Sequence, residues 1–256
     1  MKSSGTKMIK TDLHVHTTFS DGIHSPEEYV LAAMEKGMEK IGFSDHSYTP
    51  FDESYCIKKD KTDEYIRTVN GLKEKYVGKI EILCGIEWDA FGEGDISAFD
   101  YTIGSVHYLL KDGIYYPVDE SKEDFNRLCS AFGGAMNAVR EYYRNVKSLV
   151  ERAKPTIVGH FDLIAKFNEK NEFFDENSDE YFDAFKECAD TIIKYKVPVE
   201  INTGAVSRGY RTAPYPSGRA LEYLKTRGAS FVFSSDSHRK ETLLFGFEEW
   251  KEKYGL

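Results

Sequence analysis

Two histidines lie two residues apart at the end of an apolar run, in the stretch TDLHVHTTFSDG at residues 11–22. Side chains at positions i and i+2 of a β-strand point to the same face, so His14 and His16 could both bind one metal ion. A His-x-His pair alone is more typical of a polar strand end or of a hydrogen-bonded histidine. The pair therefore indicates a metal site only if further ligands join it.

Potential ligands also stand at the ends of nearly all the remaining apolar runs of the chain. These runs end in Asp45-His46, Glu87, His107, His160 and Asp236-x-His238. Only the sixth run, which ends in Asn202, lacks an obvious ligand. Six of the seven histidines thus lie at or just past the end of an apolar run. Imidazole and carboxylate ligands suit zinc, iron or manganese, and their number exceeds one tetrahedral site, which predicts a metal cluster.

The apolar runs have the length and composition of β-strands, and helical patterns lie between several of them. The runs cover residues 8–15, 40–45, 79–87, 99–107, 155–161, 197–203 and 229–236. Alternating strands and helices predict a mostly parallel sheet, and seven strands in one chain favour a (β/α)7 barrel. The carboxyl ends of barrel strands share one face, where the predicted ligands would meet.

The first helix is predicted to begin at Ser25, because Pro26 and Glu28 complete a capping-box pattern. Further helices are expected at 122–153, 178–196 and 217–227. The segments 48–78 and 108–150 exceed typical connections, and we expect them to be helical inserts over the mouth of the barrel. Residues 8–256 are expected to form a single domain, since nothing between residues 100 and 200 resembles a linker, and residues 1–7 a flexible leader.

Composition excludes several classes of protein. The net charge of −9 argues against a nucleic-acid binder, although metals can still attract a small anionic substrate. The four cysteines form no Cys-x-x-Cys pair, which fits a reducing cytoplasm. The amino terminus lacks the apolar stretch of a signal peptide, and no run is long enough to cross a membrane. No nucleotide-binding loop is apparent, and the sequence does not indicate an oligomeric state.

Six motifs together resemble the PHP family, named for polymerase and histidinol phosphatase domains. The motifs are DLHVHTTFSDG, GFSDHS, GIEWD, IGSVHYL, IVGHFDLI and SSDSH, and they span residues 12–238 in the family's order. The chain is most similar to the stand-alone L-histidinol-phosphate phosphatases of that family. The resemblance implies a distorted seven-stranded barrel with two or three divalent metals. The implied reaction is hydrolysis of L-histidinol phosphate to L-histidinol and phosphate during histidine biosynthesis.

The resemblance also implies which residues hold each metal. A first ion would be bound by His14, His16, Glu87 and Asp236. Glu87 would bridge to a second ion that His107 and His160 bind. A third ion would be bound by Asp21, His46 and His238, where some relatives have a histidine near the position of Asp21.

Phosphoester hydrolysis also needs a proton donor and fixed positive charge. Asp162 is the first candidate for the general acid, and Asp45 is the second, with the alternative that Asp45 orients a ligand. Arg208 and Arg211, in the loop after the sixth strand, are candidates for binding the phosphate, and Lys166 is a third.

Two other functions remain open at this stage. A phosphoesterase of the same family could act on nucleotides or on a DNA 3′ end, which an extended basic channel would favour. A regulatory metal-binding module without turnover would be favoured by loss of ligands, but the full set is present. Release of phosphate from a panel of phosphomonoesters separates the three functions.

Overall fold

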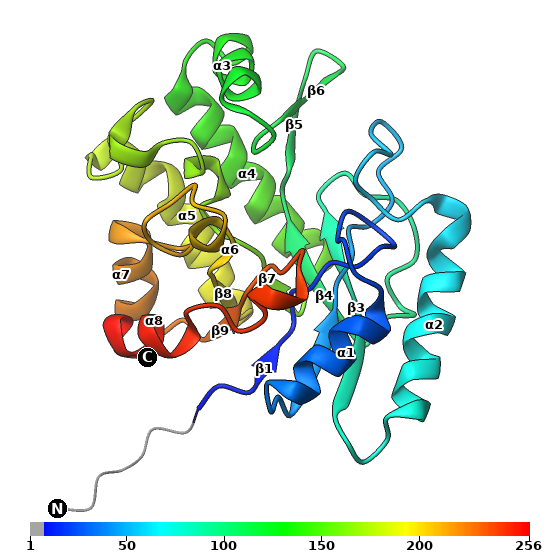
Figure 1. The fold of residues 1–256 in the computed structure, drawn as a ribbon. Coiled ribbons are helices and arrows are strands. Elements are labelled where there is room, and N and C mark those ends of the chain that lie inside the picture. Colours follow the sequence, from blue (N-terminus) through cyan, green and yellow to red (C-terminus); the bar gives the residue numbers. More distant parts are fainter. Residues whose placement is uncertain (1–7) are drawn as a thin grey trace, which may run out of the picture.

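Seven parallel strands form a nearly closed barrel in the computed structural model, which describes residues 8–256 (Figure 1). Their order is β1-β2-β3-β4-β7-β8-β9. The strands are β1 (Thr11–Asp12), β2 (Lys40–Phe43), β3 (Glu81–Asp89), β4 (Tyr101–Ser105), β7 (Ile157–Val158), β8 (Val199–Asn202) and β9 (Phe231–Ser234). All seven lie within the runs predicted from the sequence or extend them by two residues. The expected leader at residues 1–7 lies outside the described residues.

The ring closes through the segments that directly follow β1 and β9. The backbone N–H of His16 donates to the carbonyl of Ser237 at 2.9 Å, and Ser237 N–H donates to the carbonyl of His14 at 3.0 Å. The same two segments carry His14, His16, Asp236 and His238. Closure of the barrel therefore brings the first and last predicted ligands together.

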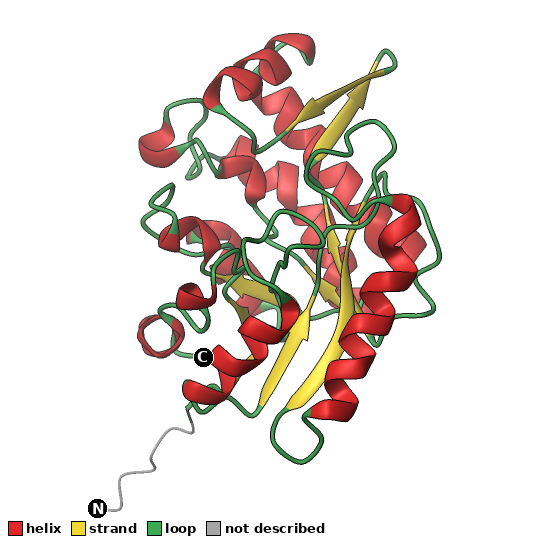
Figure 2. Ribbon diagram, turned by 45° about the vertical axis from the view of Figure 1, so that its right-hand side comes forward, coloured by secondary structure: helices red, strands yellow, loops and turns green. Residues whose placement is uncertain are grey.

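Helices surround the strands, as Figure 2 shows. They are α1 (Pro26–Glu35), α2 (Thr62–Lys75), α3 (Lys122–Ala131), α4 (Ala135–Ala153), α5 (Asp179–Tyr195), α6 (Gly204–Ser207), α7 (Gly218–Thr226) and α8 (Phe247–Tyr254). The capping box of α1 is present: Ser25 Oγ accepts from Glu28 N–H, and the Glu28 carboxylate accepts from Ser25 N–H at 2.9 Å. None of the helices among residues 8–256 has the length and apolar character needed to cross a membrane.

The predicted helix 122–153 is two helices. Gly133 and Gly134 separate α3 from α4 with φ values of +72° and +132°, a region of backbone conformation that glycine adopts without a steric penalty. Only α4 packs on the barrel, against β4 and α5. α3 packs on β6 and α4, and lies at the top of Figure 1 beside the hairpin of β5 (Tyr108–Lys111) and β6 (Ile114–Pro117).

The expectation that both long inserts cover the mouth is right only in part. In the first insert, α2 packs against β3 on the outside of the barrel, where Tyr65, Val69 and Leu72 are buried. The apolar residues of α2 recur at helical spacing, so one face of the helix packs on the barrel and α2 is a crossover helix. The loop before α2 does reach the mouth, since Tyr55 lines the cavity described below.

Tyr101 fills the interior of the barrel beneath the histidines. Its hydroxyl donates to the carbonyls of Leu13 at 2.5 Å and Phe43 at 3.1 Å. The side chain therefore reaches from β4 to the residue that follows β1 and to the last residue of β2. A Cβ atom at Gly42 or Gly85 would lie 2.4 or 2.3 Å from the tyrosine side chain. Glycine at these two positions leaves room for the tyrosine, which closes the interior below the polar end.

Candidate metal centre

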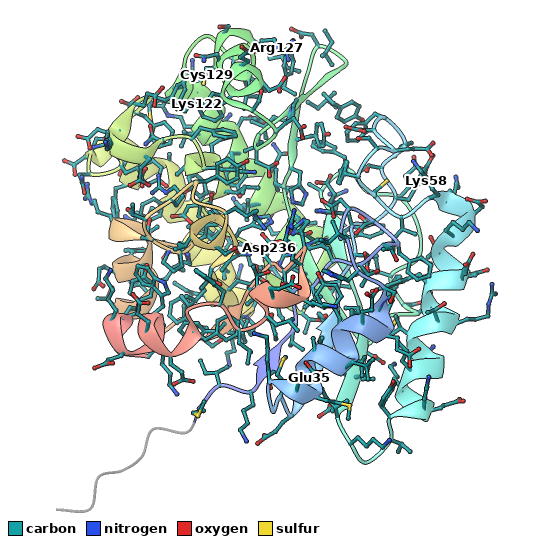
Figure 3. The ribbon with its side chains drawn as sticks, in the orientation of Figure 1. Glu35, Lys58, Lys122, Arg127, Cys129 and Asp236 are labelled. Carbon is teal, nitrogen blue, oxygen red and sulfur yellow. The ribbon has the colours of Figure 1, made fainter. Side chains whose placement is uncertain are left out.

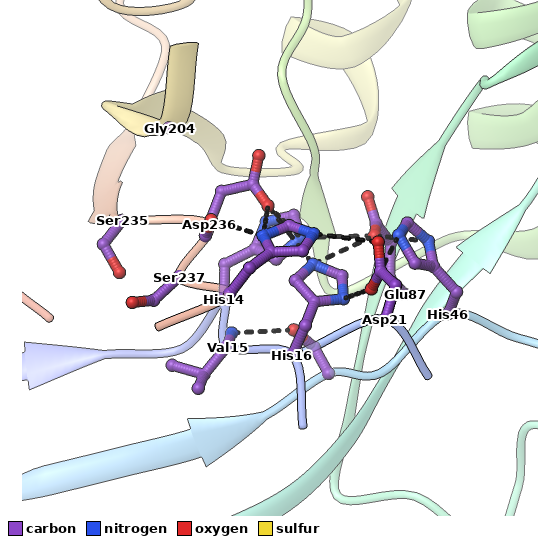
Figure 4. Close-up of polar contacts among 12 residues, drawn as sticks. His14, Val15, His16, Asp21, His46, Glu87, Gly204, Ser235, Asp236 and Ser237 are labelled. Carbon is purple, nitrogen blue, oxygen red and sulfur yellow. Dashed lines mark hydrogen bonds and ion pairs between the residues drawn. The ribbon is translucent and has the colours of Figure 1, made fainter. Parts of the chain in front are cut away.

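The nine predicted metal ligands lie around one point at the carboxyl ends of the strands. Asp236 lies near the middle of the molecule in Figure 3, whereas Glu35, Lys58 and Lys122 lie near its edge. Figure 4 shows the imidazoles of His14, His16 and His46 turned toward the carboxylates of Glu87, Asp21 and Asp236. The ligands lie in or follow six of the seven strands, all except β8, and this arrangement brings together residues more than 200 positions apart.

The carboxylate of Glu87 is the centre of this arrangement. Its Oε2 lies 2.9 Å from His46 Nδ1, 3.3 Å from His14 Nε2 and 3.5 Å from His16 Nε2. Its Oε1 lies 2.9 Å from His160 Nε2 and 3.4 Å from His107 Nε2. Burial alone would raise the pKa of Glu87, but His14, His46 and His107 hold it well below its usual value. Glu87 is therefore an ionised group that can bridge two cations.

Three sets of side chains have ligand atoms close enough to share an ion. The sets are His14, His16 and Asp236; His46, Glu87 and His107; and His16, Asp21, His46 and His238. Within each set, one ligand atom from every residue lies within 4.8 Å of the others. The first set contains the predicted ligands of the first ion except Glu87, and the third set contains those of the third ion together with His16. In the second set His46 stands beside Glu87 and His107, while His160 contacts Glu87.

Several buried atoms of this cluster have no hydrogen-bond partner. They are His14 Nε2, both ring nitrogens of His16, Glu87 Oε2 and His160 Nδ1. An unsatisfied buried polar atom costs about 1–3 kcal/mol, so such a concentration of them needs an explanation. Bound cations would satisfy the Glu87 oxygen and one lone pair of each imidazole. Nitrogen and oxygen donors without sulfur suit zinc, iron or manganese.

The charges of the cluster favour cations as well. Burial, His238 and His46 lower the pKa of His16 to about 3, so its imidazole is neutral and has a free lone pair at pH 7. Burial would also lower the pKa of His14, but Glu200, Glu87 and Asp236 hold it well above its usual value. Burial opposes ionisation of Asp21, yet His46 and His238 keep its pKa well below the usual range.

A cavity of about 240 Å³ opens over the cluster. Apart from the ligands, its lining includes Tyr55, Tyr108, Asp119, Glu120, Lys166, Arg208 and Tyr210. The loop after β2, the first residue of β5 and the loops after β6, β7 and β8 contribute these side chains. The cavity thus combines a polar floor of metal ligands with a partly aromatic wall.

Arg208 is at the cavity wall, where the sequence predicted a phosphate-binding group. Its Nη1 donates to the carbonyl of Asp236 and its Nη2 to Asp236 Oδ2, each at 2.9 Å. Gly204 makes this approach possible, because a Cβ there would lie 2.7 Å from Asp236 Oδ2 and 2.8 Å from Arg208 Nη2. Arg208 therefore supplies a fixed positive charge next to a predicted metal ligand.

Lys166 also lines the cavity. Its Nζ donates to the Asp119 carbonyl at 2.6 Å and contacts Asp119 Oδ2 at 3.1 Å. The ammonium also lies 4.8 Å from the centre of the Tyr210 ring. Lys166 is thus held at the wall by an acid and an aromatic ring.

The structure does not bring Arg211 into the cavity. Its two Nη atoms donate to the Glu176 carboxylate at 2.8 and 2.9 Å, and Nη1 also donates to the carbonyl of Ala165 at 2.8 Å. Arg211 is buried. Its guanidinium therefore joins the loops after β7 and β8. Because Arg208 and Arg211 lie in the same loop, the sequence could not show which of them faces the cavity.

The two candidate general acids also lie outside the cavity lining. Asp162 is buried, its Oδ2 accepts from Ser217 N–H at 3.0 Å, and burial raises its pKa to about 7. Asp45 Oδ1 accepts from the N–H groups of Thr17 and Ser20 at 2.7 and 3.2 Å, and from Ser20 Oγ at 2.6 Å. Asp45 thus fixes the loop that carries Asp21, which agrees with its alternative role as an orienting residue.

Sequence reasoning missed two carboxylates that contact ligands. Asp89 Oδ2 accepts from His107 N–H at 3.1 Å and lies 3.2 Å from His107 Nδ1. Glu200 Oε1 lies 2.7 Å from His14 Nδ1. Asp89 is two residues from Glu87, and Glu200 is two residues from Asn202, so the i, i+2 rule applied to His14 and His16 could have found both. Asp119 and Tyr210 lie in loops and had no comparable signal.

The fold and the site together define the class of the protein, which is a parallel barrel with imidazoles and carboxylates gathered at the carboxyl ends of its strands. The PHP domain model matches residues 12–204, and the chain belongs to that family. The chain is 28% identical to the histidinol-phosphatase of Bacillus subtilis, over 96% of this chain and 100% of the relative.

Two solved structures share the fold. One, from Listeria monocytogenes and assigned as a histidinol phosphatase, is 24% identical with a TM-score of 0.82, over 94% of this chain and 100% of that one. The other is the histidinol phosphate phosphatase of Lactococcus lactis in complex with zinc, L-histidinol and phosphate. It is 22% identical with a TM-score of 0.71, over 98% of this chain and 95% of that one.

Proposed function

We propose that this protein is a metal-dependent phosphomonoesterase that hydrolyses L-histidinol phosphate to L-histidinol and phosphate. The convergence of nine predicted metal ligands, seven of which line one cavity together with Arg208, carries the proposal. The full-length similarity to a histidinol-phosphatase supports the choice of substrate. The cavity volume of about 240 Å³ suits a small phosphate ester.

We propose two or three divalent ions, each of zinc, iron or manganese. His14, His16, Glu87 and Asp236 would hold one, Glu87 with His107 and His160 another, and Asp21, His46 and His238 the third. When bound, such ions polarise phosphoryl oxygens and lower the pKa of a bound water toward neutrality. The Lactococcus relative was solved with zinc, which makes zinc the first metal to test.

The remaining groups of the cavity bind and orient the substrate. Arg208, fixed by Asp236, can donate to two oxygens of the phosphoryl group. Lys166 adds a second positive charge at the cavity wall, where Asp119 holds it. Tyr55, Tyr108 and Tyr210 line the wall and reduce the access of water, which strengthens the electrostatic interactions of the phosphoryl group. Neither Asp162 nor Asp45 reaches the cavity, so we assign both to positioning the loops that they hold.

We further propose that the reaction belongs to histidine biosynthesis in the cytoplasm and that the partner is a small molecule. All four cysteines are free, which fits a reducing compartment. The net charge of −9 disfavours a nucleic-acid substrate.

A phosphate-release assay tests the proposal. The protein is purified anaerobically, its metal content is measured, and phosphate release is followed with L-histidinol phosphate, nucleoside monophosphates and a DNA 3′-phosphate. The proposal expects a kcat/KM for histidinol phosphate well above that for the other esters. Higher turnover of a nucleotide or DNA end would contradict the assigned substrate. No turnover of any ester by the metal-bound protein would contradict an enzymatic function. His16→Ala should abolish activity, whereas His24→Ala, the histidine outside the cluster, should retain it.

A further inference from the structure

Glu200 is a buried carboxylate that contacts two predicted ligands from different strands. Its Oε1 lies 2.7 Å from His14 Nδ1. Its Oε2 accepts from His160 N–H and from Asn202 Nδ2, each at 3.1 Å. Glu200 is 0% exposed, and both of its oxygens have partners, in contrast to Glu87 Oε2. Glu200 therefore has the contacts of a group that holds ligands, and does not belong to the sets that could share an ion.

The contact with Glu200 determines which ring nitrogen of His14 is free. A carboxylate only accepts hydrogen bonds, which assigns the proton of this contact to His14 Nδ1 and leaves Nε2 as the nitrogen that can bind an ion. His14 Nε2 has no hydrogen-bond partner and lies 3.3 Å from Glu87 Oε2 and 3.7 Å from Asp236 Oδ1. His14 Nε2 thus faces the carboxylates with which His14 would share an ion.

The positions of Glu200 and Asn202 along β8 explain how this strand supports the candidate metal centre. Glu200 and Asn202 are two residues apart, so both side chains face the interior of the barrel. Asn202 donates to Glu200, and its Oδ1 accepts from Gly204 N–H at 2.9 Å, at the start of the turn that leads to Arg208. β8 is the strand for which the sequence offered no ligand.

We propose that Glu200 is a positioning residue, which fixes the tautomer of His14 and ties the backbone of His160 to the same carboxylate. β8 thereby supports the metal centre without donating a ligand. This inference rests on the metal centre of the proposed function, but it does not depend on the identity of the substrate. Asp89 stands in the same relation to His107, with its Oδ2 3.2 Å from Nδ1.

The isosteric substitution Glu200→Gln tests the proposal. The amide oxygen should stay where His160 N–H and Asn202 Nδ2 both donate, which turns the amide NH₂ toward His14. That NH₂ would donate to Nδ1, and the proton of His14 would move to Nε2, which could no longer bind a metal. Loss of such a supporting contact typically weakens metal affinity by roughly 10- to 100-fold.

Zinc retention is measured by elemental analysis after dialysis against graded chelator, without substrate. The Glu200→Gln variant should lose zinc from one site at 10- to 100-fold lower chelator strength than the wild-type protein. Glu176→Gln is the matched control, because Glu176 contacts Arg211 and Asn168 and none of the predicted ligands. It should retain zinc like the wild-type protein. Unchanged retention in Glu200→Gln would overturn the proposal.

Long-range ¹⁵N–¹H correlation spectra of histidine-labelled protein give a second readout that does not need the variant to fold. In the zinc-bound wild-type protein, His14 should carry its proton on Nδ1 and bind through Nε2. A wild-type spectrum with the His14 proton on Nε2 would overturn the proposal by itself. If zinc binds with the expected tautomer but histidinol phosphate is not hydrolysed, the proposed function fails and the role of Glu200 stands.

Discussion

Glu87 Oε1 lies 2.9 Å from His160 Nε2, although 73 positions separate the two residues in the sequence. Glu87 lies in β3 and His160 follows β7, and β4 lies between these strands in the sheet. The contact exists only because the sheet curves into a barrel and directs both side chains inward. It places one carboxylate among five imidazoles, which is the arrangement expected of a bridging metal ligand.

Replacement of Glu87 by glutamine should disrupt the metal centre. The amide has the same shape but lacks the negative charge that faces His14, His46 and His107. We expect loss of bound metal, and a fall in kcat of roughly 10²- to 10³-fold. Glu81→Gln, in the exposed first position of the same strand, is the control and should behave like the wild-type protein. Full metal content and normal turnover in Glu87→Gln would refute a bridging role.

Arg208→Ala should chiefly raise KM. Removal of a charged hydrogen-bond donor to the phosphate costs about 1.5–3 kcal/mol, which corresponds to a rise in KM of roughly 10- to 100-fold. Metal content is measured in parallel, because Arg208 also contacts Asp236. Arg227→Ala, which removes an exposed arginine beside Asp190, is the control. Unchanged KM and kcat would remove Arg208 from the site.

Arg211→Met should lower stability and leave KM within about twofold of the wild-type value. Arg211 joins two loops through Glu176, and removal of one partner of this partly buried ion pair leaves the other charge without its partner, at a cost of roughly 1–3 kcal/mol. Urea unfolding measures the change in free energy, and initial rates on histidinol phosphate measure KM. A large rise in KM with unchanged stability would restore Arg211 as a phosphate-binding residue.

Asp162 should make the protein less stable as the pH rises. Burial raises its pKa to about 7 from the usual 3.8, so between pH 4 and 7 the folded state keeps a proton that the unfolded state has lost. Stability then falls with pH at up to about 1.4 kcal/mol per pH unit from this group. In Asp162→Asn the slope of unfolding free energy against pH should be flatter over this range. Parallel curves for the two proteins would show that Asp162 ionises normally in the folded state.

Strand positions and the convergence of the predicted ligands were accessible from the sequence because both follow local rules. Apolar runs marked all seven strands, and a ligand at the end of a run must lie at the shared rim of a parallel barrel. The capping box at Ser25 and Glu28 likewise depends on residues three apart. Such features need no knowledge of how distant segments pack.

Features that depend on loop geometry were not accessible. Arg208 and Arg211 are three residues apart, yet one lines the cavity and the other is buried against Glu176. Asp162 follows a ligand by two residues, but the chain after β7 turns it toward Ser217. The break at Gly133 and Gly134 was visible as a glycine pair, but the periodicity on both sides of it favoured one helix.

Anomalous X-ray scattering from a zinc-loaded crystal tests the central claim most directly, because it locates bound ions without reference to activity. The structure predicts two or three zinc peaks at the carboxyl ends of the strands, within bonding distance of the sets that contain His14, Glu87 and Asp21. Zinc bound elsewhere on the protein, with no peak among these side chains, would contradict the claim.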